Sequence, residues 1–516
     1  MPIKVLWADD EIDLLKPHII FLEQKGYEVS IAKSGDEALD LIFSNNYDIV
    51  FLDENMPGLT GLETLTRIKG KQPRLPVVMI TKSEEETIMN EAIGSNISDY
   101  LIKPVNPNQI LLSLKKNLEN KKLMSEKTNM GYQQEFRQIS MDISDRPDLE
   151  TWENIYRKMI FWELELEKSQ DTGLKEILKM QKSEANTVFA KFVMANYQDW
   201  LSGQAEERPV LSHVAIREKV LPLLESDEKF FLIIVDNLRF DQWKILQPAI
   251  ENHYRVEKEE IIYCILPTAT QYARNAFFAG LMPSEILKRF PQYWIGEGDE
   301  GTRNQFESQL FEEQLKRLGL NIPFHYHKIL NLNAGKKLLE NINNFTGRQL
   351  NVLVYNFVDM LSHARTDMEV IKELADDEAA YRSLTLSWFE HSPLLEIIRF
   401  LQDKKINIII TTDHGSIKVS NPTKVIGDKN TNTNLRYKTG KHLQYNPGDV
   451  FEVRNPQDIF LPRTNISSSY IFAKEDSFFA YPNNYNYYVN YYRNTFQHGG
   501  LSMEEMLVPF VYLKAR

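Results

Sequence analysis

The sequence contains a single cysteine, Cys264, among 516 residues. One cysteine excludes an intrachain disulfide and a zinc site built from thiolates. Long apolar runs are missing too, since no stretch of about 18 apolar residues is present to cross a membrane. The first residues, MPIKVLWADDE, lack the charged-then-apolar order of a signal peptide. We therefore expect a cytoplasmic protein with no membrane attachment, in which Cys264 is a buried strand residue.

Basic residues are also in the minority. The chain has 60 Lys and Arg against 72 Asp and Glu, a formal net charge of -12. This balance argues against a protein that holds nucleic acid through a broad basic face, although a local basic groove is compatible with it. Hydrophobic residues make up 42% of the chain, enough to build packed cores. The length predicts about three domains.

The N-terminal residues 1–120 alternate short apolar runs with amphipathic segments. Five runs are strand candidates, namely IKVLWA, YEVSIA, YDIVFLD, PVVMIT and ISDYLI. This alternation is typical of parallel strands linked by helices, so we expect a doubly wound α/β sheet of five strands. Residues 121–205 differ, because apolar residues such as Leu174, Ile177 and Phe189 recur there at helical spacing. They predict a helical bundle or linker domain.

Residues 206–516 return to strongly apolar strands, FFLIIVD, LNVLVYNFVD and INIIITTDH, separated by helical segments. They predict a second, larger α/β domain. Its Asn-rich and Tyr-rich stretches, including 481–492, are typical of long loops or an inserted subdomain. The tyrosines of 481–492 could stack nucleobases, but we favour a loop packed by its own aromatic rings.

Acidic residues end the first and third strands of the N-terminal domain. Asp9 and Asp10 follow the first strand, and Asp53 closes the third. The carboxyl ends of parallel strands meet at one edge of a sheet, so these carboxylates should gather there and bind Mg²⁺. A bound Mg²⁺ would neutralise a phosphoryl group at Asp53. Thr81 could donate a hydrogen bond to that group and Lys103 could pair with it, although each residue alone could instead cap a helix or face solvent.

With ADDE, LDENMPGLTG, ITK and LIKP at the expected strand ends, residues 1–120 resemble response-regulator receiver domains. The resemblance implies that Asp53 is the phosphoacceptor, Thr81 the switch hydroxyl and Lys103 the phosphate partner. Tyr100 would be the switch aromatic or simply a core residue. Lys82 departs from the family pattern, in which a small residue follows the switch threonine. The implied Mg²⁺ ligands are Asp9, Asp10, Asp53 and the backbone carbonyl of Asn55.

Nothing after residue 120 offers the short basic recognition helix of a DNA-binding output domain. Acids and histidines end several strands of the C-terminal domain instead. Zinc binds imidazole nitrogen and carboxylate oxygen, and two-metal sites hold their ions about 3.5–4 Å apart. The acids and histidines in question are Asp236, Asp359, His363, Asp413, His414 and His498. Each of them alone is better explained as a core or turn residue, but together they predict two metal sites.

This ordered set, with a threonine in LPTATQYAR, resembles the alkaline phosphatase superfamily. The resemblance implies Thr270 as nucleophile, with Thr268 as the alternative. Arg274 would clamp a phosphate, or else lie at the surface. One implied zinc ion is held by His498, His363 and Asp359, and the other by Asp236, Asp413, His414 and Thr270.

A receiver, a helical middle and a PglZ-type domain together resemble the response regulators associated with type IX secretion. The resemblance implies a zinc-dependent phosphodiesterase that acts on cyclic and linear oligonucleotides. Its implied partners are a sensor histidine kinase of the PorY type, a second copy of the chain upon phosphorylation, and a sigma factor or secretion-system component. Sequence-specific DNA binding is not expected. The alternative function is a metal-stabilised signalling scaffold. The true substrate and the direction of control by phosphorylation stay open.

Overall fold

The structure is a computed structural model that describes residues 3–73, 75–82, 97–169, 171–225, 228–297, 299, 301–375, 377–428, 431–463, 465 and 467–516. The chain divides into two compact units, Met1–Gln134 and Glu135–Arg516. Neither expected boundary coincides with this division. Helix α5 (Pro107–Ser144) continues through residue 120, and the helices before residue 205 share a hydrophobic core with the C-terminal sheet.

The first unit contains the five predicted strands in a parallel sheet of order β2-β1-β3-β4-β5. One apolar cluster on the sheet includes Leu6, Val50 and Met79, and another includes Val5 and Phe51. Because alternate residues of a strand point to opposite faces, both faces of the sheet are covered, which confirms the doubly wound fold. The elements are β1 (Ile3–Ala8), α1 (Lys16–Gln24), β2 (Tyr27–Ala32), α2 (Gly35–Ser44), β3 (Ile49–Asp53), α3 (Gly61–Lys71), β4 (Val77–Thr81) and β5 (Asp99–Ile102).

Two further helices, α6 (Leu149–Glu167) and α7 (Thr172–Ser202), follow α5 and confirm the predicted helical region. Each is preceded by an aspartate at its N-cap, Asp148 or Asp171, whose side chain accepts a hydrogen bond from a backbone N–H of the first turn. Their apolar faces meet through rings such as those of Trp152 and Phe189, whose centroids lie 5.2 Å apart. Ile177 is an exception to the predicted apolar face, with 40% of its surface exposed.

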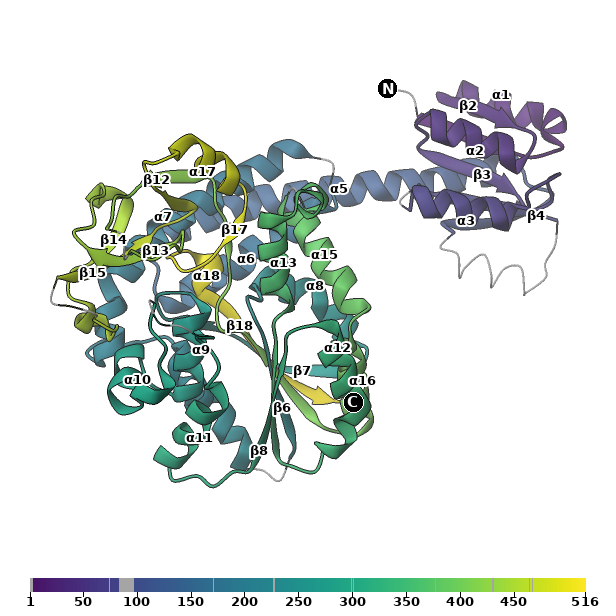
Figure 1. Ribbon diagram of the computed structural model, residues 1–516. Helices are drawn as coiled ribbons and strands as arrows, with labels where there is room; N and C mark the ends of the chain where they lie inside the picture. The colour runs from purple at the N-terminus through teal and green to yellow at the C-terminus, as the bar shows by residue number, and fades with distance from the viewer. Residues whose placement is uncertain are drawn as a thin grey trace. The chain divides into compact units, whose positions relative to one another are not determined.

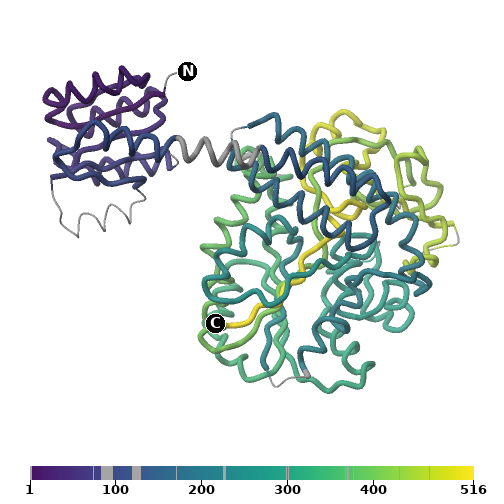
Figure 2. The backbone as a smooth tube through the Cα atoms, turned by 180° about the vertical axis from the view of Figure 1, so that it is seen from behind, coloured from purple at the N-terminus to yellow at the C-terminus, as the bar shows by residue number. Residues whose placement is uncertain are grey.

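The second unit is built on a six-stranded sheet of order β7-β18-β10-β6-β9-β8. Strands β10, β6, β9 and β8 are parallel, whereas β18 is antiparallel to both of its neighbours. Figure 2 shows β18 as the yellow strand that runs through the middle of this unit. Strands β6, β9 and β10 are buried along their whole length, which explains their continuous apolar runs. The strands are β6 (Phe230–Val235), β7 (Tyr254–Tyr263), β8 (Phe324–Ile329), β9 (Leu350–Tyr355), β10 (Asn407–Thr411) and β18 (Leu507–Ala515).

Helices cover this sheet on both faces. Figure 1 shows α9, α10 and α11 on one side and α12 and α16 on the other. None of the helices in the described part of the chain is both long and apolar enough to cross a membrane. The main helices of this unit are α8 (Phe240–Glu251), α9 (Thr270–Ala279), α10 (Pro283–Arg289), α11 (Glu307–Arg317), α12 (Leu332–Asn341), α13 (Phe357–Asp367), α14 (Glu369–Leu374), α15 (Glu378–Glu390), α16 (Pro393–Asp403) and α18 (Met503–Met506).

Small sheets lie between β10 and β18, as expected for an inserted subdomain. Strand β12 (Asn421–Lys424) pairs with β16 (Ser477–Ala480), and β15 (Ser468–Ala473) pairs with both β13 (Tyr437–Lys441) and β14 (Val450–Val453). The segment 481–492 is not a long loop, because most of it forms helix α17 (Tyr485–Tyr492). Its tyrosines stack on one another one turn apart, as in the pair Tyr488 and Tyr492 with centroids at 6.3 Å. The self-packing that we favoured is therefore confirmed.

Candidate functional site

The carboxyl ends of β10, β6 and β9 lie side by side, because these strands are parallel neighbours in the sheet. Asp236 follows β6 directly, and Asp413 follows β10 after one intervening residue. Asp359 lies in the first turn of α13, the helix that comes after β9. One edge of the sheet thus collects carboxylates that are 54 to 177 positions apart in the chain, as open α/β folds do at their ligand sites.

One group of metal-ligand type consists of Asp236, Asp413 and His414, whose ligand atoms all lie within 4.8 Å of one another. Nε2 of His414 is 3.9 Å from Asp236 Oδ1 and 3.6 Å from Asp413 Oδ2. The other ring nitrogen, Nδ1, is engaged with the carbonyl oxygen of Gly415 at 3.1 Å, which leaves Nε2 for a ligand role.

The carboxylates of this group are buried and short of hydrogen bonds. Asp236 and Asp413 are fully buried, and neither Asp236 Oδ1 nor Asp413 Oδ2 has a hydrogen-bond partner. Burial raises the pKa of Asp236 to about 6, and the like charge of Asp413 adds to the rise. Buried acceptors without donors are rare in proteins, and a cation between them would satisfy both. The group therefore fits a metal ion such as zinc.

A second group consists of Asp359, His363 and His498, again with ligand atoms within 4.8 Å of one another. Helix α13 presents Asp359 and His363 on one face, four residues apart, and the two side chains approach to 3.6 Å. His498 Nε2 lies 3.7 Å from Asp359 Oδ1, while its Nδ1 is held at 3.2 Å from the carbonyl of Thr268. Burial, together with His414 and His363, holds the pKa of His498 well below its ordinary value. A neutral imidazole is the form that binds a metal.

The two groups are adjacent, since the rings of His414 and His498 stack with centroids 4.2 Å apart. The structure thus brings together all six predicted zinc ligands in the two predicted sets. The two groups differ in their exposure to solvent. In one group 66% of the His363 side chain is exposed, whereas in the other Asp236, Asp413 and His414 are all buried.

The two candidate nucleophiles have different surroundings. Thr270 is the first residue of α9, and its Oγ1 lies 2.9 Å from Nε2 of His414. Thr268 is fully buried, and its hydroxyl donates to the carbonyl of Gly500 at 2.8 Å and accepts from the N–H of Gly499 at 3.0 Å. The Thr270 hydroxyl therefore faces the metal-ligand groups, whereas the Thr268 hydroxyl holds a neighbouring loop.

Arg274 is buried, with 2% of its surface exposed, so its predicted alternative as a surface residue is wrong. Its Nη1 lies 2.7 Å from Asp236 Oδ2, and its Nε donates to Glu307 at 2.8 Å. Burial alone would lower the pKa of Arg274, but Asp236 and Glu307 hold it well above its ordinary value. Glu307 was not singled out in the sequence, because an acid at the start of a helix such as α11 is common at protein surfaces.

The first unit carries the third predicted group. Asp9, Asp10 and Asp53 offer carboxylate oxygens within 4.8 Å of one another. Lys103 Nζ lies 2.8 Å from Asp9 Oδ2 and 3.0 Å from Asp53 Oδ2. Burial raises the pKa of Asp53, and the charges of Asp9 and Asp10 contribute to the rise. Asp53 Oδ1 has no hydrogen-bond partner. This all-oxygen set fits Mg²⁺.

The remaining predicted receiver residues surround this group. Thr81 ends β4 and is fully buried, and the Tyr100 hydroxyl is hydrogen-bonded to its side chain. Asn55 is exposed two residues after Asp53. Lys82, which departs from the receiver pattern, forms an exposed ion pair with Glu11 at 2.7 Å. Lys82 is thereby engaged at the rim of the site.

Comparisons with known proteins match three successive parts of the chain. Family models match residues 215–513 (BREX system PglZ alkaline phosphatase-like domain), 122–201 (PorX response regulator linker domain) and 5–115 (response regulator receiver domain). Transcriptional regulatory protein ResD of Bacillus subtilis strain 168 is 33% identical over 112 residues, which cover 22% of this chain and 46% of ResD. Transcriptional regulatory protein SrrA of Staphylococcus aureus strain NCTC 8325 is 31% identical over the same length, with the same coverage. The chain spans about half the length of these curated relatives.

Solved structures match the first unit. A CheY-like receiver domain from Methanospirillum hungatei JF-1 is 27% identical and covers 23% of this chain and 96% of its own, with a TM-score of 0.23. The receiver domain of NtrX from Brucella abortus is 33% identical and covers 22% and 98%, with a TM-score of 0.22. The PglZ model by itself covers more than half of the chain, and the other two models cover most of the rest. The chain therefore belongs to the PglZ alkaline phosphatase-like family and has the receiver, linker and PglZ order of PorX response regulators.

Proposed function

We propose that this response regulator uses phosphorylation of Asp53 to control a zinc-dependent phosphodiesterase in its C-terminal domain. One observation carries the proposal: the Thr270 hydroxyl lies 2.9 Å from His414, beside two adjacent groups of carboxylates and histidines. An attacking hydroxyl next to two sets of metal ligands suits phosphoryl transfer at a two-metal site.

The residues present fit two zinc ions. His498, His363 and Asp359 would hold one, and Asp236, Asp413 and His414, with the Thr270 hydroxyl, would hold the other. Bound zinc would lower the pKa of the attacking oxygen and offset negative charge on the phosphoryl oxygens.

The residues of the chain divide the remaining work. Thr270 attacks phosphorus in line and displaces one alcohol of the diester, so that the hydroxyl of Thr270 loses a proton and the leaving alcohol gains one. Water then hydrolyses the ester between Thr270 and the remaining phosphoryl group, which frees Thr270 and a phosphomonoester. Because Thr270 begins α9, backbone N–H groups of its first turn are available to the phosphoryl oxygens. Both sides of the Arg274 guanidinium are engaged, by Asp236 and by Glu307, so its contacts favour positioning of Asp236 over clamping of a phosphate.

The substrates that we propose are cyclic and linear oligonucleotides, in line with the resemblance to PorX response regulators. The receiver domain implies a histidine kinase partner. We further propose that this kinase is of the PorY type, that Asp9, Asp10 and Asp53 bind Mg²⁺, and that the protein dimerises on phosphorylation. We also propose that it is located in the cytoplasm and regulates type IX secretion through a sigma factor or a secretion-system component.

A direct test measures hydrolysis of bis-para-nitrophenyl phosphate and of short cyclic and linear oligonucleotides by zinc-loaded protein, with and without beryllofluoride at the receiver. We expect zinc-dependent turnover that beryllofluoride changes and that Thr270→Ala removes. Absence of turnover under all these conditions would favour the alternative function, a metal-stabilised scaffold that signals through its partners.

A further inference from the structure

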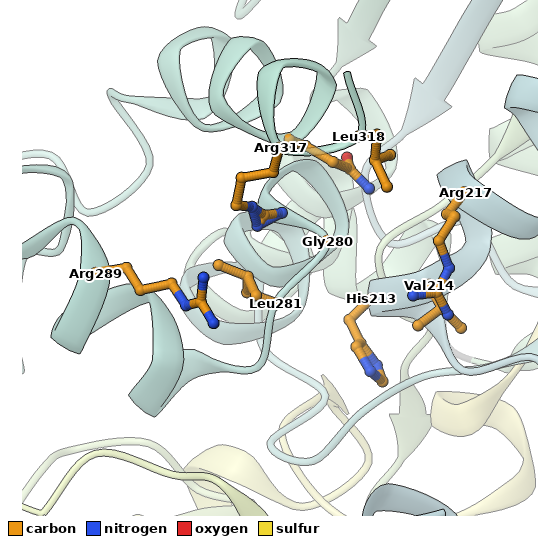
Figure 3. A pocket seen from close by; sticks show the side chains of 9 residues that line it. His213, Val214, Arg217, Gly280, Leu281, Arg289, Arg317 and Leu318 are labelled. Atoms are coloured by element: carbon orange, nitrogen blue, oxygen red, sulfur yellow. The ribbon is translucent and has the colours of Figure 1, made fainter. Parts of the chain in front are cut away.

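A cavity of about 210 Å³ lies in the second unit, where the C-terminal end of α9 meets α11 and the 3-10 turn Ser212–Val214. Figure 3 shows the side chains around it. Three arginines line the cavity, Arg217, Arg289 and Arg317, and they come from three separate segments of the chain. None of the described residues that line it is acidic. Such a concentration of positive charge is unexpected in a chain with a net charge of -12.

Two of these arginines take part in no ion pair among the described residues. Arg217 pairs with Glu218 at 3.0 Å, but within the described ranges no carboxylate pairs with Arg289 or Arg317. Arg317 donates through Nη2 to the carbonyl of Ala279, whereas its buried Nε has no hydrogen-bond partner. Burial lowers the pKa of Arg317, and the like charge of Arg289 lowers it further, against a smaller opposite effect of Glu285 and Glu313. An anion between the two guanidinium groups would remove this repulsion and accept the unused N–H.

Other polar atoms of the lining are also unsatisfied. Nδ1 of His213 and Oε1 of Gln314 are buried and have no hydrogen-bond partner. Burial, followed by the charges of Arg217 and Arg208, lowers the pKa of His213 to about 3, so its ring is neutral at pH 7 and offers one N–H. Buried polar atoms without partners are rare, and three belong to residues that line this one cavity. Two of them, Arg317 Nε and His213 Nδ1, are nitrogens that can donate to an anion, whereas Gln314 Oε1 is an acceptor and does not contribute to anion binding.

The geometry of the cavity suits a tetrahedral anion. In Figure 3 the guanidinium groups of Arg289 and Arg317 lie near Leu281, and His213 lies on the far side of Leu281 from Arg289. Planar guanidinium groups bind two oxygens of a phosphate at once. The volume is about seven times the share of one water molecule in the liquid, which leaves room for a phosphate group with a small substituent.

We propose that this cavity is a binding site for a phosphate group, distinct from the metal-ligand groups. Helix α9 separates the two, because Thr270 begins the helix and the cavity lies beyond its last residue, Ala279. Ten helical residues span about 15 Å, too far for one phosphate to contact both ends. The proposal does not rest on the proposed phosphodiesterase activity.

The experiment measures binding of inorganic phosphate, adenosine monophosphate and adenosine to the zinc-loaded full chain by isothermal titration calorimetry. The test variant is Arg289→Gln, because Arg289 is exposed and lies outside the metal-ligand groups. Its matched control is Lys288→Gln, an exposed neighbour that does not line the cavity. A second test variant, Arg217→Gln, removes a cation from the opposite wall. Wild type and the three variants should bind phosphate equally at the metal-ligand groups. A difference in affinity between these proteins therefore reports binding at the cavity.

We expect wild type and Lys288→Gln to share a binding event that Arg289→Gln weakens about tenfold or more and Arg217→Gln weakens less. Hydrolysis of bis-para-nitrophenyl phosphate without added ligand should be the same in all four proteins. Binding of inorganic phosphate identifies the free anion as sufficient, and binding of the nucleotide alone identifies a phosphomonoester. Equal affinity in wild type and Arg289→Gln, or binding of adenosine as tight as that of the nucleotide, would overturn the proposal.

Discussion

The hydroxyl oxygen of Thr270 lies 2.9 Å from Nε2 of His414, although the two residues are 144 positions apart in the chain. Thr270 begins α9, and His414 follows β10. The same Nε2 lies near the carboxylates of Asp236 and Asp413. A cation bound by these three residues would therefore contact the hydroxyl as well, and this relationship is what makes Thr270 the better nucleophile candidate.

Replacement of the nucleophile tests this assignment. We expect Thr270→Ala to lower phosphodiesterase turnover at least about 100-fold, because no other hydroxyl replaces it. Thr270→Ser and Thr268→Ser should stay active, since each keeps its hydroxyl group. Steady-state hydrolysis of bis-para-nitrophenyl phosphate provides the measurement. Turnover of Thr270→Ala close to that of wild type would show that another group attacks.

His363 tests the independence of the two metal-ligand groups. Its side chain is 66% exposed, so His363→Ala should change the free energy of unfolding of the metal-free protein by less than about 0.5 kcal/mol. Bound zinc should fall by about one ion of two, because one group loses a ligand while the other is intact. Metal analysis after dialysis measures this, with the exposed His391→Ala as control. A full zinc content in His363→Ala contradicts the ligand assignment.

The stabilisation of the protein by zinc should depend on pH. In the metal-free protein the pKa of Asp236 is raised to about 6, so a proton occupies its carboxylate below that pH and competes with zinc. Because the folded-state pKa lies above the unfolded value, the metal-free protein loses stability as pH rises from about 4 to 6. The difference in Tm between zinc-loaded and zinc-free protein should therefore increase from pH 5 to pH 7. A difference that shrinks over this range would argue against a metal at Asp236.

Arg274 should be structurally important in the metal-free protein. Its removal leaves the buried carboxylate of Asp236 without its guanidinium partner and leaves Glu307 paired with Lys328 alone. We expect Arg274→Met to cost about 3–5 kcal/mol of unfolding free energy, measured with urea. Asp236→Asn in the same background should recover part of the loss, because the unpaired buried charge disappears. A cost below about 1 kcal/mol would mean that the ion pairs contribute little.

Phosphorylation of the receiver domain should require the carboxylate of Asp53. Asp53→Asn should abolish the mass increase that acetyl phosphate produces in the presence of Mg²⁺, since the acceptor carboxylate is lost. Lys103→Gln should still react but should be phosphorylated to a lower level, because Nζ lies 3.0 Å from Asp53 Oδ2 and would pair with the phosphoryl group. Asp40→Asn, an exposed acid on α2, is the control. A mass increase retained in Asp53→Asn would place the phosphorylation elsewhere.

Much of the fold followed from local pattern. The five strands of the first unit and the strands β6, β9 and β10 lie within the predicted apolar runs. Boundaries between units were harder to predict. Helix α5 runs past residue 120 because nothing in its local sequence stops it, whereas α6 and α7 join the C-terminal core through contacts that are distant in sequence. The segment 481–492 looked like a loop because Asn and Tyr have weak helix propensity, which packing of the tyrosines overcomes in α17.

Local sequence pattern was enough to identify the side chains that end the strands, and with them many of the ligands in the three groups. Apolar runs define strands, and the polar residue after a buried strand must emerge at the edge of its sheet. Tertiary structure decided what no local pattern contains. It set the order that makes β10, β6 and β9 neighbours, turned Thr270 rather than Thr268 toward His414, and paired Arg274 with Glu307. It also gathered Arg217, Arg289 and Arg317 around one cavity. Such pairings depend on how distant elements pack, and each arginine alone resembles an ordinary surface residue.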